Sequence, residues 1–167
     1  SHYTLARVLA VRGEFRESLL YFRRASDLNP SDSLVLIAMS EPLLFDGQTD
    51  RAIHALLDAA AVDPLHGDWL RWQQGWAYWQ NEECETGLDA MLGMSTPPAA
   101  SRKSLAALYV CLGREAEARE ALRPFLEARP DHTLADERRT FPASWQPGER
   151  WLEAMRLSGM PAAPVSR

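Results

Sequence analysis

Several features that define special classes of protein are missing from this chain of 167 residues. It has only two cysteines, Cys84 and Cys111, whose spacing suits neither a zinc site nor a disulfide-rich fold. It has no run of about 18 apolar residues that could span a bilayer, and no charged N-terminal region followed by an apolar stretch, as in a signal peptide. We therefore expect no membrane partner and a reducing, cytoplasmic location in which both cysteines are small core residues.

Positive charge is also scarce. The chain has 18 lysines and arginines against 23 aspartates and glutamates, which gives a formal net charge of −5. A nucleic-acid-binding domain normally carries a basic surface, so we expect no direct nucleic-acid partner. The apolar share of 46% and the charged share of 25% are those of an ordinary globular protein.

What the chain does contain is an internal repeat of 34 residues. A turn glycine, a small residue twelve positions later and a closing proline recur at this interval, as Gly13, Ala25 and Pro30 and then as Gly47, Ala59 and Pro64. Gly113 and Pro130 repeat the interval between the glycine and the proline. A period of this length predicts two-helix units that stack into a curved array, with the small residue at a close helix crossing.

We therefore predict an all-α fold, a right-handed superhelical solenoid of about four helix-turn-helix units plus a C-terminal capping helix. The units would span 1–32, 33–66, 67–98 and 99–131. Region 132–161 would supply a short helix and an amphipathic helix that covers the apolar face of the last repeat. Residues 162–167 would form a flexible tail.

The third unit departs from the pattern. Asn81 stands where the turn glycine belongs, and asparagine is the next-best residue for a left-handed backbone. Thr86 replaces the small residue, although Gly87 beside it also lacks bulk. Pro98 lies 34 residues after Pro64, so we expect the register to continue through this unit.

The chain begins with Ser1-His2-Tyr3 inside a helical pattern, without an initiator methionine or a polar cap. An exposed first repeat normally needs such a cap. We therefore expect a fragment of a longer protein, with Ser1-His2 either native or a cloning remnant.

The repeat resembles the tetratricopeptide repeat (TPR) family. The matching positions in the first unit are Leu5-Ala6, Gly13, Phe15, Phe22, Ala25 and Pro30, and the later units carry copies of them. The aromatic residue usual early in the first helix is absent, and the third unit is weak. The resemblance implies a module that binds proteins and has no catalytic residues.

A narrower resemblance concerns the C-terminal repeat region of proteobacterial class III adenylate/guanylate cyclases and of related winged-helix transcription regulators. It rests on Gly67-Asp68-Trp69, the helix with Trp72, Trp76, Tyr78 and Trp79, Pro97-Pro98, Leu112-Gly113-Arg114 and Met155-Arg156-Leu157-Ser158-Gly159-Met160-Pro161. It implies the regulatory or partner-binding part of a larger bacterial signalling protein, with catalysis or DNA binding outside this chain.

The family geometry predicts which residues line the concave groove: Tyr3, Arg7, Ile37, Glu41, Leu44, Phe45, Arg71, Tyr78, Trp79 and Lys103. Phe45, Tyr78 and Trp79 would be the apolar anchors for a protein or peptide partner. Trp69, Trp72 and Trp76 are expected to pack in the core instead. The alternative is a homodimer or structural scaffold, formed through apolar residues of an exposed first helix.

We expect no metal, cofactor or catalytic site. The four histidines are scattered and are expected at the surface or at helix caps. Glu82, Glu83 and Glu85 begin a helix, where negative charge is favoured by the helix dipole. The pairs Arg23-Arg24 and Arg138-Arg139 are too short to indicate a phosphate-binding site.

Overall fold

The computed structural model describes residues 1–65 and 67–164, and every regular element among them is a helix. The helices are α1 (His2–Val11), α2 (Phe15–Leu28), α3 (Ser33–Phe45), α4 (Thr49–Val62), α5 (Asp68–Gln80), α6 (Cys84–Leu92), α7 (Ser101–Cys111), α8 (Glu115–Ala128), α9 (Leu134–Arg138) and α10 (Gly148–Leu157). The predicted all-α fold is confirmed. Within the described ranges, no helix is long and apolar enough to cross a bilayer. Residues 162–164 of the predicted tail are exposed, whereas 165–167, like His66, lie outside the described residues.

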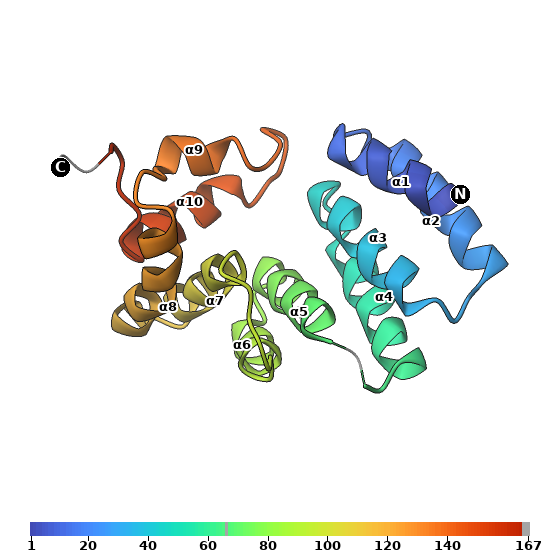
Figure 1. Ribbon diagram of the computed structural model, residues 1–167, viewed down its shortest axis with the longest axis horizontal. Helices are drawn as coiled ribbons and strands as arrows, with labels where there is room; N and C mark the ends of the chain where they lie inside the picture. Colours follow the sequence, from blue (N-terminus) through green and yellow to red (C-terminus); the bar gives the residue numbers. More distant parts are fainter. Residues whose placement is uncertain (66, 165–167) are drawn as a thin grey trace.

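The first eight helices form four pairs in chain order, α1 with α2, α3 with α4, α5 with α6 and α7 with α8. Each pair packs on the one before it, since α3 contacts α2, α5 contacts α4 and α7 contacts α6. The first helices of successive pairs also contact one another, so they line one continuous inner face. Figure 1 shows the pairs following a curve, with α9 and α10 at its C-terminal end.

Small residues set how closely the two helices of a pair approach. In the first pair, the Ser18 hydroxyl donates a 2.7 Å hydrogen bond to the carbonyl oxygen of Ala6 on the facing helix. Ala25, the predicted crossing residue of this pair, is only half-buried. The equivalent positions are buried in all four pairs: Ala6 and Ser18, Ser40 and Ala52, Gly75 and Gly87, Ala106 and Ala118. Bulkier side chains there would force the helices apart.

The third pair is shifted by one residue relative to the prediction. The left-handed backbone of its turn belongs to Glu82, with φ 61°, whereas Asn81 has φ −84°. Thr86 is exposed, and Gly87 is the buried small residue. Both Glu82 and Gly87 lie 35 residues after their counterparts in the second pair, so the expectation of an unbroken 34-residue register is wrong. Glu82 therefore carries a backbone cost that glycine avoids in the other three turns.

Cys84 and Cys111 form a disulfide that joins the start of α6 to the end of α7. Their Cα atoms are 6.3 Å apart, within the usual range for a disulfide. The expectation of two reduced core cysteines is wrong, and only Cys84 is buried. Because disulfides persist mainly in oxidising compartments, the cysteines no longer support a cytoplasmic location, which stays a prediction.

Gly87→Val is expected to lower the free energy of unfolding by at least about 2 kcal/mol, because the crossing has no room for a side chain. A Cβ at Gly87 would lie 2.8 Å from Leu108 Cδ2 and 3.1 Å from the carbonyl oxygen of Gly75. Urea unfolding followed by circular dichroism measures the change. Thr86→Val, at the exposed neighbouring position, is the control and should cost less than about 0.5 kcal/mol. Equal losses in the two variants would contradict the crossing.

Breaking the disulfide should also destabilise the chain. Its cysteines are 27 residues apart in sequence, and losing a constraint on a loop of that size costs about 3 kcal/mol. Urea unfolding of the wild type, with and without reductant, measures this difference. Cys111→Ser should match the reduced wild type and should not respond to reductant. A wild type that is equally stable in both conditions would argue against the disulfide.

Candidate functional site

The segment between α9 and α10 folds back onto the inner face of the solenoid. It places Trp145 among five other aromatic rings at centroid distances of 5.0–6.1 Å: Phe45, Trp76, Trp79, Phe141 and Trp151. The Trp145 indole N–H donates a 3.0 Å hydrogen bond to Oε1 of Gln80 on α5. Region 132–161 therefore does more than the predicted covering of the last repeat. Its α10 contacts α7 and α8, and Trp145 reaches α3 and α5 as well.

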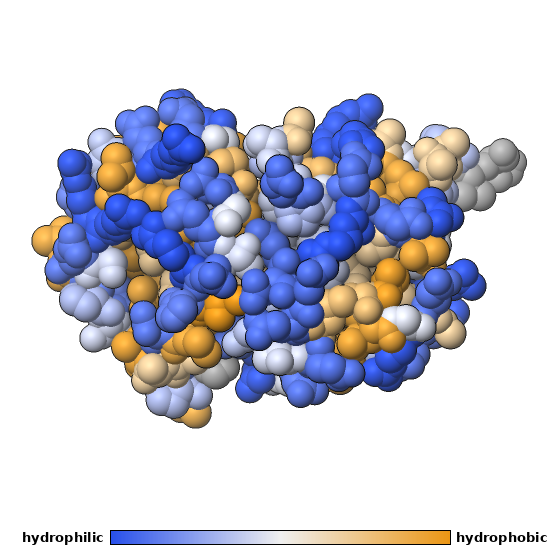
Figure 2. All heavy atoms as spheres, turned by 180° about the vertical axis from the view of Figure 1, so that it is seen from behind, coloured by the Kyte–Doolittle hydropathy of each residue, from blue (hydrophilic) through white to orange (hydrophobic). Residues whose placement is uncertain are grey.

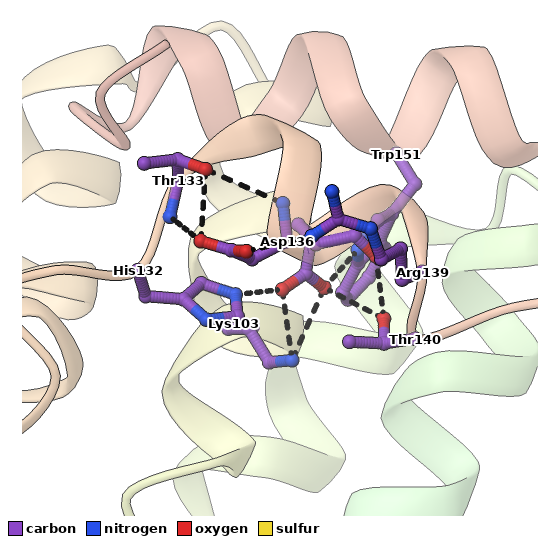
Figure 3. Close-up of polar contacts among 8 residues, drawn as sticks. Lys103, His132, Thr133, Asp136, Arg139, Thr140 and Trp151 are labelled. Carbon is purple, nitrogen blue, oxygen red and sulfur yellow. Dashed lines mark hydrogen bonds and ion pairs between the residues drawn. The ribbon is translucent and has the colours of Figure 1, made fainter. Parts of the chain in front are cut away.

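Glu137 of α9 fixes this segment to the solenoid, and its side chain is 1% exposed. Each carboxylate oxygen accepts a 3.1 Å hydrogen bond from Lys103 Nζ of α7. Trp151 Nε1 of α10 donates to the same carboxylate at 2.9 Å, and His132 Nε2 lies 2.8 Å from it (Figure 3). Beside it, Asp136 closes a capping box at the start of α9. One buried carboxylate thus holds α7, α9 and α10 together.

These contacts also set the pKa of Glu137. Burial raises the pKa, but the charge of Lys103 and the hydrogen bonds from Trp151, His132 and Lys103 lower it by more, so the net pKa lies below its ordinary value. A carboxylate with a lowered folded pKa stabilises the fold fully above its unfolded pKa of about 4.3. That contribution is lost as the pH falls through the folded pKa.

Two adjacent hollows remain open on the inner face. The first has a volume of about 340 Å³ and is lined by α1, α3 and α5. The second, which we call the aromatic hollow, has a volume of about 300 Å³ and lies between α3, α5, α7 and the returning segment. Glu41, Trp69 and Gln73 line both hollows, so together they form one inner groove.

Five of the ten predicted groove residues line these hollows: Arg7, Ile37, Glu41, Phe45 and Lys103. Tyr3 lies at the N-terminal edge, where its hydroxyl accepts a 3.2 Å hydrogen bond from Arg7. Arg71 and Tyr78 face α6 instead, because the Arg71 guanidinium packs against Gly93 and Tyr78 Cβ packs against Gly87.

Leu44 and Trp79 are wrongly predicted as groove residues. Their exposed fractions are 0% and 1%, so neither side chain is accessible to a partner. Leu44 belongs to the core around α3 and α4. Trp79 is covered by Trp151, at a centroid distance of 5.2 Å, and by the guanidinium of Arg150, 4.1 Å from the ring centroid.

Within the tryptophan cluster of α5, Trp79 is therefore the most buried ring, against the prediction, whereas Trp69, Trp72 and Trp76 pack against the core as expected but only in part. Trp69, Trp72 and Trp76, expected in the core, are half-buried and line the aromatic hollow. The indole N–H of Trp72 donates a 3.1 Å hydrogen bond to the Ser104 hydroxyl on the facing wall. These three rings contribute apolar surface to the open groove.

Trp145 and Glu137 are not predicted from the sequence as parts of the site. Trp145 does give a signal, since a tryptophan outside any helical pattern usually needs a buried tertiary contact. Glu137 gives none, because it lies in a charged helical segment of ordinary appearance. His132, expected at the surface or a cap, is half-buried between Glu137 and Phe125. In the part of the chain that the structure describes, no group of three or more His, Cys, Asp or Glu could hold a metal ion.

Glu137→Gln is expected to lower the free energy of unfolding by about 3 kcal/mol at pH 7, because Lys103 loses its buried partner. Urea unfolding followed by tryptophan fluorescence measures the loss. The difference from the wild type should begin to shrink as the pH falls below about 4.3, and it should be lost as the pH falls through the lower pKa of Glu137 in the folded state.

Glu149→Gln is the matched control, since Glu149 is exposed and pairs with Arg138 in solvent. This control should change the stability little. A Glu137 variant as stable as the wild type, or a loss that does not depend on pH, would contradict the role assigned to Glu137.

Known proteins resemble this chain in fold rather than in sequence. No protein-family model and no curated protein matches the chain. Among solved structures, the chain is similar to TTC0263, a thermophilic TPR protein of Thermus thermophilus, with TM-score 0.67 and 22% identity over 93% of this chain and 80% of that one. It is also similar to MamA of Desulfovibrio magneticus RS-1, with TM-score 0.65 and 16% identity over 93% and 92%. A third is YrrB, a TPR protein with an unusual peptide-binding site, with TM-score 0.60 and 15% identity over 94% and 82%. The chain therefore has the fold of TPR proteins.

Proposed function

We propose that this chain is a protein-recognition module that binds a segment of a partner protein in the inner groove. One observation carries the proposal: Trp69, Trp72 and Trp76 are only half-buried and line the aromatic hollow. Tryptophans in such pockets supply much of the binding energy of protein interfaces. Stacked repeats offer an extended concave surface for this purpose. An apolar helix or extended segment suits a groove of this kind.

The biological setting that we propose is the regulatory part of a larger bacterial signalling protein, whose catalytic or DNA-binding domain lies outside this chain. The support is the resemblance of two segments to the cyclase repeat region, and each segment has a structural role. Asp68 accepts hydrogen bonds from the backbone N–H groups of Ser95 and Thr96 at 2.8 and 2.6 Å. The C-terminal segment buries Met160, and its Pro161 carbonyl accepts a bond from the N–H of Leu134 on α9. A cytoplasmic location fits this setting.

A homodimer is the second candidate, and one observation favours it. Leu5 and Val8 on α1 are 40% and 43% exposed, on the helix where a preceding repeat would pack. On the face opposite that of Figure 1, apolar patches lie among hydrophilic side chains (Figure 2). The homodimer candidate therefore rests on α1.

Selection of phage-displayed random peptides on the immobilised chain tests the leading proposal. We expect peptides that bind the wild type and lose at least about tenfold in affinity on Trp72→Ala, measured by fluorescence anisotropy. Leu57→Ala is the control, because Leu57 is exposed on α4 and lines neither hollow. Circular dichroism confirms that each variant is folded, and Trp69→Ala serves as a second groove variant.

Peptides that bind both groove variants as tightly as the wild type, or the absence of any enriched peptide, would contradict the proposal. Light scattering addresses the second candidate. A chain that stays monomeric at high concentration would exclude the homodimer, whereas a dimer that Leu5→Lys dissociates would support it.

A further inference from the structure

All six tryptophans of the chain gather in one region. Four lie on α5, Trp145 lies in the segment before α10, and Trp151 lies on α10. Trp79, Trp145 and Trp151 are buried and pack on one another. The other three form a wall of the aromatic hollow, with Phe141 also in its lining. This division leaves some indole rings open to a ligand.

The protein already places cations against the aromatic rings of this region. The guanidinium of Arg150 lies 4.1 Å from the Trp79 ring centroid, and that of Arg7 lies 5.9 Å from the Trp69 centroid. Among aromatic side chains, tryptophan attracts a cation to its ring face most strongly. Within the described residues, no lysine or arginine lies over Trp72 or Trp76. Trp76 packs against Phe45 and Trp145 at centroid distances of 5.1 and 5.9 Å, yet both indoles still line the hollow, where no cation of the described residues occupies them.

Charge in the aromatic hollow also favours a cation. Lys103 lines the hollow, but the Glu137 carboxylate neutralises it at 3.1 Å. Glu41 lines the same hollow, and in the described part of the chain no ion pair is made to it. Glu41 is exposed as a residue, and partial removal of its carboxylate from water raises its pKa, against the charge of Arg7, which lowers it. Among the described residues, Arg7 is the counter-charge that acts on Glu41, but the two form no ion pair, so the Glu41 carboxylate can still accept a cation.

We propose that the aromatic hollow binds the side chain of an arginine carried by the partner protein, with Trp72, Trp76 and Glu41 as its contacts. A volume of about 300 Å³ is at the lower end for ligand pockets, and it suits one long side chain. A planar guanidinium stacks on indole faces better than an ammonium does. This inference rests on the proposed function and names the chemistry that the groove recognises.

The test is a titration of the whole ¹⁵N-labelled chain with the blocked pentapeptide Ala-Ala-Arg-Ala-Ala, followed by the indole N–H signals in NMR spectra. Titration to about 5 mM detects the weak binding expected of one side chain. The matched peptide carries citrulline, which keeps the shape of arginine without its charge. We expect the signals of Trp72 and Trp76 to move, and the citrulline peptide to bind at least about fivefold more weakly.

Glu41→Gln should lower the ratio of the affinities for the arginine and citrulline peptides by at least about threefold. Glu127→Gln, at an exposed position of α8, should leave that ratio unchanged. If the two peptides bind equally, or if Glu41→Gln has no effect, the arginine site is wrong. The proposed function then still stands, provided that peptides from the phage selection depend on Trp72. If neither those peptides nor the arginine peptide moves the indole signals, both proposals fall.

Discussion

Each helix pair is held by a close approach at two small residues, twelve positions apart, and the rest of the structure depends on this approach. In the first pair it is close enough for Ser18 to bond the backbone of the facing helix. The repeated approach lets the first helices of successive pairs contact one another and form a continuous inner face. The third pair crosses through two glycines, and the same α5 carries four tryptophans. One helix can carry both the glycine and the tryptophans because Gly75 lies on the face at the crossing, whereas Trp72 and Trp76 lie on the face toward the groove.

The C-terminal segment turns this open face into a groove with defined hollows. Trp145 fills the space between α3 and α5, and Glu137 fastens the segment through Lys103 and Trp151. A buried carboxylate is costly unless it is paired and hydrogen-bonded, and Glu137 meets both conditions. The same ion pair neutralises a cation at the groove, which leaves Glu41 to set the charge of the aromatic hollow. The residue that fastens the segment, Glu137, and the residue proposed to recognise a cation, Glu41, therefore line the same hollow.

The repeat could be predicted from sequence because its signals are local. Turn glycines, closing prolines and small residues recur at fixed intervals, and helical periodicity follows from them. The site could be predicted only in part. The groove positions of Arg7, Glu41 and Phe45 could be predicted, because these residues lie on the first helices of their pairs. The burial of Trp79 could not, because it depends on Trp151 and Arg150, far along the chain. The one-residue shift of the third pair is hidden as well, because Pro98 happens to preserve the 34-residue interval while Glu82 and Gly87 do not.

The central claim is that the segment before α10 lies inside the curve of the solenoid and completes the groove. Nuclear Overhauser effects between the ring protons of Phe45 and Trp145 measure this most directly, because the two residues come from distant parts of the chain. With ring centroids 5.6 Å apart, the account predicts clear cross-peaks between these rings. Absent cross-peaks, together with a Trp145 indole N–H that exchanges with water as fast as an exposed one, would contradict it.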